Sequence, residues 1–138
     1  MLAVDDSTLT WEIKRLYFVD DAPVALSRYT IPAAMVPDLD QRDLHESIME
    51  VLAGYNLKPA FTRENISAAT ARMEEQKLLQ VSRSHPLLRF VRLLKDETGR
   101  AIAYIEASLR SDIVNVEVIM GDDPAPEPST SRGAGENT

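Results

Sequence analysis

Two stretches of the 138-residue sequence share one layout, and both predict a β-hairpin. The first reads RLYFVDDAPVAL from Arg15, and the second reads RLLKDETGRAIAY from Arg92. Each places an arginine on an apolar strand, followed by an acidic turn and a second apolar strand. The similarity extends backwards, because Leu2 precedes Arg15 and Leu79 precedes Arg92 by the same thirteen residues. We therefore expect a duplicated unit, with chance similarity of two amphipathic hairpins as the alternative.

The remaining pattern predicts two helices among the strands, and hence an α+β fold with a mostly antiparallel sheet. Asp43, with Glu46 three residues later, is typical of a helix start, and Gly54 is typical of a helix end. Thr70 is expected to open the second helix, which should end near Leu79. The expected strands are residues 11–19, 24–31, 60–68, 87–94, 100–110 and 113–119.

The two chain ends differ from the body of the sequence. Because Leu79 is expected to end a helix, the repeat implies a helix before Leu2 that this sequence does not contain. We therefore expect an N-terminally incomplete domain over residues 1–120. Residues 121–138 combine proline, glycine and acidic residues without a large apolar side chain, which predicts a disordered acidic tail.

The charge and composition exclude several function classes. The net charge is −7 and no cluster of basic residues appears, so the chain is a poor candidate for binding DNA by itself. There is no cysteine and no apolar run long enough to span a membrane, which suits a cytoplasmic protein. His45 and His85 do not have the spacing of a metal pair or a catalytic triad. We expect no enzyme activity, no catalytic residue, no metal site and no cofactor.

The following motifs succeed one another along the chain: RLYFVDDAPVAL, YTIP, ESIMEVL, ENISAATARMEE, PLLRFVRL, GRAIAY and LRSD. Together they resemble the effector-binding UTRA domain of the HutC branch of the GntR family of bacterial transcription regulators, from Leu2 to Val118. This resemblance implies a chorismate-lyase-like fold in which both hairpins join one sheet. It also implies a small-molecule effector and a homodimer. DNA would be bound only through a winged helix-turn-helix domain that this sequence lacks.

The resemblance places the effector near Arg15, Tyr17, Ser27 and Ser47. Arg15 and Tyr17 are two residues apart on one strand and should share a face, and a guanidinium suits forked binding of a carboxylate or phosphate. Ser27 on the paired strand and Ser47 early in a helix could add hydroxyl groups. Alternatively, Arg15 could pair with a surface acid, and Ser47 could serve only in local helix capping.

The sequence also departs from the family pattern. Sugar-phosphate members of the family commonly have two arginines where this chain has Arg15 and Tyr17, so a phosphosugar is not supported and we expect another small anion. We expect Arg92 to hold the sheet together through Glu106, and Glu64 to be a solvated strand residue. The alternatives for the whole protein are a chorismate-lyase-like enzyme and a truncated regulator fragment without function.

Overall fold

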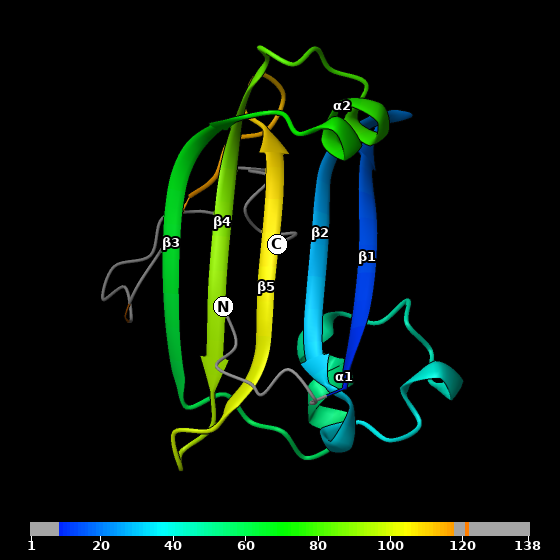
Figure 1. Ribbon diagram of the computed structural model, residues 1–138, viewed down its shortest axis with the longest axis vertical. Coiled ribbons are helices and arrows are strands. Elements are labelled where there is room, and N and C mark those ends of the chain that lie inside the picture. Colours follow the sequence, from blue (N-terminus) through cyan, green and yellow to red (C-terminus); the bar gives the residue numbers. More distant parts are fainter. Residues whose placement is uncertain (1–8, 118–120, 122–138) are drawn as a thin grey trace, which may run out of the picture.

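A computed structural model describes residues 9–117 and residue 121 of the chain. One five-stranded antiparallel sheet, with strand order β1-β2-β5-β4-β3, runs through it (Figure 1). The strands are β1 (Thr10–Val19), β2 (Ala22–Pro32), β3 (Phe61–Thr70), β4 (Pro86–Lys95) and β5 (Ala101–Arg110). The helices are α1 (Ile48–Gly54) and α2 (Met73–Leu79), with short 3-10 turns at Ala33–Met35 and Leu39–Gln41. The predicted α+β class, with a mostly antiparallel sheet and two helices, is confirmed.

Both predicted hairpins are present, and each has a turn that suits its sequence. Asp20 and Asp21 close β1 onto β2 in the left-handed region, with φ of 49° and 68°, as tight hairpin turns require. In the turn from β4 to β5, Gly99 has a φ of 88°, and the Asp96 carboxylate accepts the Thr98 backbone N–H at 2.9 Å. The two hairpins join through antiparallel pairing of β2 with β5. The repeated unit therefore forms one continuous sheet.

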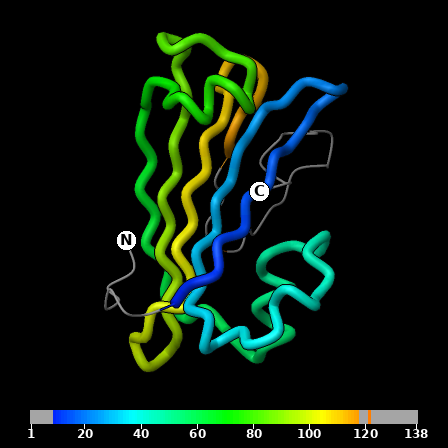
Figure 2. The backbone as a smooth tube through the Cα atoms, turned by 45° about the vertical axis from the view of Figure 1, so that its right-hand side comes forward, coloured from blue at the N-terminus to red at the C-terminus, as the bar shows by residue number. Residues whose placement is uncertain are grey.

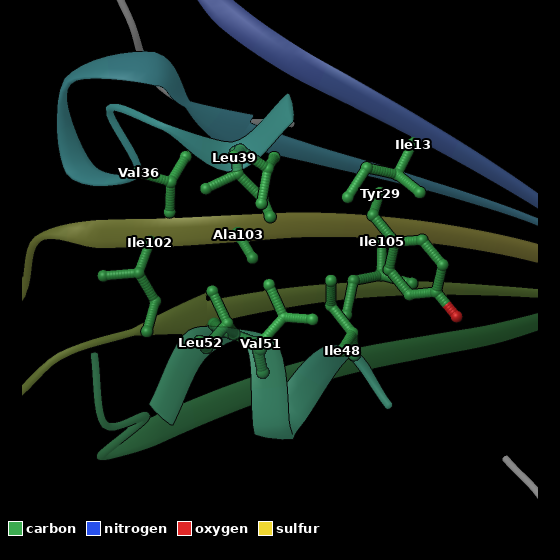
Figure 3. Packing of buried hydrophobic residues seen from close by; sticks show 12 residues of the cluster. Ile13, Tyr29, Val36, Leu39, Ile48, Val51, Leu52, Ile102, Ala103 and Ile105 are labelled. Carbon is green, nitrogen blue, oxygen red and sulfur yellow. The ribbon is translucent and has the colours of Figure 1, made fainter. Parts of the chain in front are cut away.

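Helix α1 covers one face of the sheet, which we call the α1 face and which carries Ile13, Arg15 and Tyr17. Side chains alternate between the faces of a strand, so their cross-strand neighbours lie on the same side. In Figure 3 the apolar side chains of α1 converge on this face beside Tyr29 and Ile105. The buried cluster contains Ile13, Tyr29, Ile31, Val36, Leu39, Ile48, Val51, Leu52, Leu94, Ile102, Ala103 and Ile105.

Helix α2 packs on the opposite face, which we call the α2 face. It lies at the other end of the sheet from α1, as Figure 2 shows. A second buried cluster forms there from Leu26, Ala71, Leu79 and Leu87. The two helices thus bury different faces and different ends of the same sheet, which leaves part of each face free of helix.

The start of α1 differs from the prediction. Asp43 is not its N-cap; the N-cap is Ser47, whose hydroxyl accepts the backbone N–H of Glu50 at 3.2 Å. Asp43 instead accepts the backbone N–H of His45 at 2.9 Å, within the loop before the helix. The sequence contained this signal, because Ser47 and Glu50 have the same three-residue spacing as Asp43 and Glu46.

The start of α2 was also misplaced. Thr70 is the last residue of β3, and α2 begins at Met73. The Arg72 backbone N–H donates to the Glu75 carboxylate at 2.8 Å, which satisfies a helix-end donor without a Thr70 hydroxyl. The prediction that the helix ends at Leu79 is confirmed.

The predicted strand at residues 113–119 is wrong for its described part, residues 113–117, which form no strand. Strand β5 lies between β2 and β4, so no free edge is available beside it. A turn at Arg110, whose carbonyl accepts the Val114 N–H at 3.0 Å, instead sends the chain across the α1 face. There Val114 is buried in a cluster with Val24, Ala25 and Leu109.

The remaining predictions for the chain ends fall outside the described residues. These are the repeat start at Leu2, the last residues of the 113–119 segment, and the tail over residues 121–138 apart from Gly121. Val114 and Val116 pack on the sheet face that carries Arg15.

Candidate functional site

Three of the four predicted effector residues are neighbours on the α1 face. Arg15 of β1 lies opposite Ser27 of β2, and Tyr17 lies opposite Ala25 in the next row of the same face. On one side of these rows, α1 packs over Tyr29. On the other side, the segment carrying Val114 packs over Ala25. The candidate site is therefore a strip of sheet between two covering segments.

Arg15 is half-buried, and its guanidinium is only partly used by the protein. One terminal nitrogen donates to the Leu44 carbonyl at 2.7 Å, and the guanidinium carbon lies 5.5 Å from the centroid of the Tyr29 ring. The Arg15 Nε is buried and has no hydrogen-bond partner within residues 9–117. The expected alternative, an ion pair with a surface acid, is not found in that range. A buried donor without a partner costs roughly 1–3 kcal/mol, so a bound acceptor would be favoured here.

Two tyrosine hydroxyls stand beside this arginine. The hydroxyls of Tyr17 and Tyr29 are hydrogen-bonded at 2.9 Å. Burial raises the pKa of Tyr29 to about 12, helped by the hydrogen bond with Tyr17. Tyr29 therefore stays a neutral hydroxyl at physiological pH. The strip offers a fixed cation and neutral hydroxyl groups, a combination that suits an anionic ligand.

Short side chains form the floor of the strip. One cross-strand row runs from Arg15 through Ser27 and Ala107 to Phe90. Ser27 is buried, with 6% of its surface exposed. Serine and alanine, which have short side chains, thus stand between an arginine and a phenylalanine in this row. The row therefore has a charged end and an apolar end, with a hydroxyl group between them.

Within the described residues, Ser47 makes no side-chain hydrogen bond to Arg15, Tyr17 or Ser27. It is exposed, and its hydroxyl oxygen caps α1 by accepting the Glu50 N–H, so the capping role expected as an alternative is present. Ser47 does follow Leu44, whose carbonyl Arg15 binds, by three residues. Its hydroxyl can still donate its own proton while accepting from Glu50.

Arg92 also lies on the α1 face, but the expected partner was wrong. Arg92 is opposite Ile105, so Glu106 points to the other face and cannot reach it. Arg92 Nε instead donates to the Glu64 carboxylate at 2.6 Å. Glu64 is thus an ion-paired residue rather than a purely solvated one, and Arg92 holds β4 to β3.

The α2 face has a small hollow of about 50 Å³, well below the ~300 Å³ of ordinary ligand pockets. Its charged groups already have partners: Arg89 binds Glu75 at 2.6 Å, and Arg72 binds Glu106 at 2.8 Å. We therefore assign this hollow a structural role. It is lined by Leu26, Arg28, Arg72, Glu74, Glu75, Glu106 and Ser108.

A comparison with known families matches the UTRA domain model over residues 1–115. The chain belongs to the UTRA domain family. The HTH-type transcriptional regulator GgaR of Escherichia coli K12 is 27% identical over 112 residues, which are 81% of this chain and 44% of that protein. The UTRA chain thus spans less than half the length of the curated relatives it matches.

Solved structures of GntR and HutC-type regulators share the fold of this UTRA domain. The GntR-family transcriptional regulator of Enterococcus faecalis V583 superposes with a TM-score of 0.77 at 19% identity, covering 86% of both chains. The C-terminal domain of the histidine utilization repressor of Pseudomonas syringae pv. tomato DC3000 gives 0.74 at 17% identity, covering 88% of this chain and 85% of that one. The fold class predicted from the family resemblance is confirmed.

Sequence reasoning missed two parts of the candidate site. Tyr29 could have been found, because it lies two residues after Ser27 on the same strand and so shares its face. The Leu44 carbonyl could not, because it belongs to a loop brought to Arg15 by long-range folding. Within the described residues, no cluster of three or more His, Asp or Glu side chains could hold a metal ion. No helix among them is long and apolar enough to cross a membrane.

Proposed function

We propose that this UTRA domain binds a small anionic effector on the α1 face and acts as the sensing part of a cytoplasmic transcription regulator. The Arg15 guanidinium carries this proposal, since its Nε donor is buried and unpaired within the described residues. The effector's carboxylate or phosphate would accept from Arg15, with the hydroxyls of Tyr17, Ser27 and Ser47 as further contacts. The apolar part of the effector would lie toward Phe90.

The output of the domain would be a change in dimer geometry. Effector binding can change the balance between two conformations of a protein only if these conformations differ in affinity for the effector. The strip lies between α1 and the segment carrying Val114. An effector that contacts both of these segments would favour one position of α1 relative to the Val114 segment. Full-length relatives such as GgaR are named as HTH-type regulators, which supports coupling of this domain to DNA binding in a whole regulator.

The test is a thermal-shift panel of small carboxylates and phosphates at millimolar concentration. The panel is run on the wild-type chain, on Arg15→Ala and on Arg100→Ala. Arg100 is exposed in the β4–β5 turn, so its variant makes the same change in net charge away from the strip. Losing one charge-assisted contact should cost about 1.5–3 kcal/mol, or roughly ten- to a hundredfold in affinity.

We expect a hit that stabilises the wild type and Arg100→Ala but stabilises Arg15→Ala much less. A hit that stabilises all three proteins equally would remove Arg15 from the site. No stabilisation by any carboxylate or phosphate would contradict an anionic effector. The ligand-free melting temperature of Arg15→Ala must be measured alongside, because the variant also loses the hydrogen bond to Leu44.

A further inference from the structure

The segment that carries Val114, residues 111–117, is held on the α1 face by few contacts, and we call it the strap. Figure 1 shows it in orange where it turns back at the end of β5. Within the described residues its backbone makes two hydrogen bonds, from the N–H groups of Ile113 and Val114 to the Arg110 carbonyl at 3.2 and 3.0 Å. Residues 115–117 make none there. A segment with so few hydrogen bonds opens more easily than a paired strand.

Two valines attach the strap to the sheet. Val114 is buried, Val116 is half-buried, and the rest of the strap is exposed. Val114 packs in an apolar cluster with Val24, Ala25 and Leu109 of the sheet. The burial of one full side chain and part of another has to offset the entropy lost when seven residues become ordered. The closed position of the strap is therefore only marginally stable.

One polar group, the Asp112 carboxylate, holds the start of the strap. It accepts a hydrogen bond from a terminal nitrogen of Arg110 at 2.9 Å and lies 3.1 Å from Nε2 of His85, in the loop before β4. The bond from Arg110 is the main cause that lowers the pKa of Asp112 to about 2, so this carboxylate is charged at neutral pH. Its side chain is 45% exposed, and ion pairs at such positions contribute little.

The strap shares its apolar cluster with residues of the candidate effector strip. Ala25, a member of the cluster, lies opposite Tyr17 in the sheet. Tyr17, Ala107 and Phe90 all pack against this cluster. Ala107 and Phe90 belong to the row that begins at Arg15. The closed strap therefore occupies apolar surface at the side of the strip that lies away from α1.

We propose that the strap opens about Arg110 while α1 and the sheet stay folded, and that in its closed position it covers the Ala25 side of the strip. The other border of the strip, α1, is held by three buried side chains, whereas the strap has one. The strap is therefore the border that opens first. Its opening uncovers Ala25 and Phe90. Only the consequence for effector access rests on the proposed function.

The sequence has no cysteine, so a single introduced thiol can report opening in the full 138-residue chain. Val114→Cys and Val51→Cys form a matched pair, because these valines are 6% and 5% exposed and lie on the strap and on α1. Maleimide labelling is followed by mass spectrometry, since a buried thiol reacts only when it becomes exposed. We expect Val114→Cys to react at least about tenfold faster than Val51→Cys. It should react more slowly than Ile113→Cys, at an exposed position of the strap.

Second substitutions test what holds the strap closed and what it covers. In the Val114→Cys background, Asp112→Asn weakens the bond to Arg110 and should speed labelling about two- to fivefold, as expected for a partly exposed ion pair. Glu117→Gln removes the same charge at an exposed position of the strap and should leave the rate unchanged. Ala25→Cys, at a buried position of β2, should show the same acceleration by Asp112→Asn, because strap opening uncovers both thiols.

Equal labelling rates of Val114→Cys and Val51→Cys would overturn separate opening of the strap. Labelling of Val114→Cys as fast as that of Ile113→Cys would overturn the closed position. If Asp112→Asn speeds Val114→Cys but not Ala25→Cys, the strap does not cover the strip. Circular dichroism shows which variants fold, and if Val114→Cys does not, the comparison of Ala25→Cys with Val51→Cys decides.

The labelling needs no ligand, which separates this proposal from the proposed function. A strap that opens as expected, together with an anion panel that gives no hit, would overturn the anionic effector and leave the strap standing. An anion that binds through Arg15, together with equal labelling of Val114→Cys and Val51→Cys, would do the reverse.

Discussion

At the scale of single residues, two ion pairs in this domain look alike but differ in burial. The Glu75 and Arg89 side chains are 5% and 11% exposed, whereas Glu64 and Arg92 are 23% and 38% exposed. Burial alone would raise the pKa of Glu75. The hydrogen bonds that its carboxylate accepts from the Arg72 backbone, Ser108 and Arg89 outweigh burial and hold that pKa below its usual range. The charged form of Glu75 is therefore a source of stability.

We expect Glu75→Gln to lower the free energy of unfolding at pH 7 by roughly 3 kcal/mol, because Arg89 would be left as a buried, unpaired charge. Since the pKa of Glu75 is lowered by folding, its contribution is complete above the ordinary glutamate pKa of about 4.3. The contribution is lost as pH falls toward the lower folded-state pKa. The difference between wild type and variant in urea unfolding should therefore shrink between about pH 5 and pH 3.

The control is Glu64→Gln, which breaks the more exposed pair and should cost less than about 1 kcal/mol at pH 7. Equal losses for the two variants would show that burial does not distinguish these pairs. A difference between Glu75→Gln and wild type that stays constant down to pH 3 would contradict the lowered pKa.

At the scale of secondary-structure elements, α1 depends on its packing. It has seven residues, too few for an isolated helix to be stable in water. Its buried side chains, Ile48, Val51 and Leu52, hold it on the sheet (Figure 3). Because α1 borders the candidate effector strip, the packing of α1 on the sheet also holds that border of the strip in place.

We expect Leu52→Ala to destabilise the domain by about 2–5 kcal/mol, because Leu52 is fully buried and its truncation leaves a cavity. Met49→Ala on the same helix is the control; Met49 is 47% exposed, and its loss should change stability by no more than about 0.5 kcal/mol. Both are measured by urea unfolding. Similar values for the two variants would mean that α1 is not anchored through its buried face.

Local patterns in the sequence predicted the elements well, and long-range pairing explains what they missed. The hairpins and the end of α2 follow from alternation and turn residues close together in the chain. The partner of Arg92 depended on the register between β4 and β5, where a shift of one residue changes the face. Of the candidate site, the closeness of Arg15, Tyr17 and Ser27 followed from one hairpin. The hydrogen bond of Arg15 to the Leu44 carbonyl and the packing of Val114 beside the strip could be seen only in the folded chain.

At the scale of the whole molecule, the C-terminal region of the sequence has two parts that differ in apolar content. Val114 is 6% exposed and belongs to a buried cluster on the α1 face. The sequence after Met120 has no large apolar side chain that could add to such a cluster. Only the first of these two parts should contribute to folding.

We expect a chain ending at Met120 to melt within about 2 °C of the full chain, since the removed residues have little surface to bury. A chain ending at Ser111, which also removes Val114, should melt several degrees lower, because a loss of about 1 kcal/mol shifts the midpoint of a domain this size by about 4 °C. Both are measured by differential scanning calorimetry. A large drop for the first truncation would show that the tail packs on the domain.

The strand order also has a consequence for how the chain reaches its native state. The central strand is β5, and its pairing with β2 joins Tyr29 to Ile105, which lie far apart in the sequence. Contacts between residues so distant in sequence slow folding, because a long loop must close before they form. During synthesis the β1–β2 hairpin must wait for β5 to leave the ribosome, which takes several seconds at about 5–20 residues per second. The row from Arg15 to Phe90 is thus completed only when β5 pairs with β2 and β4.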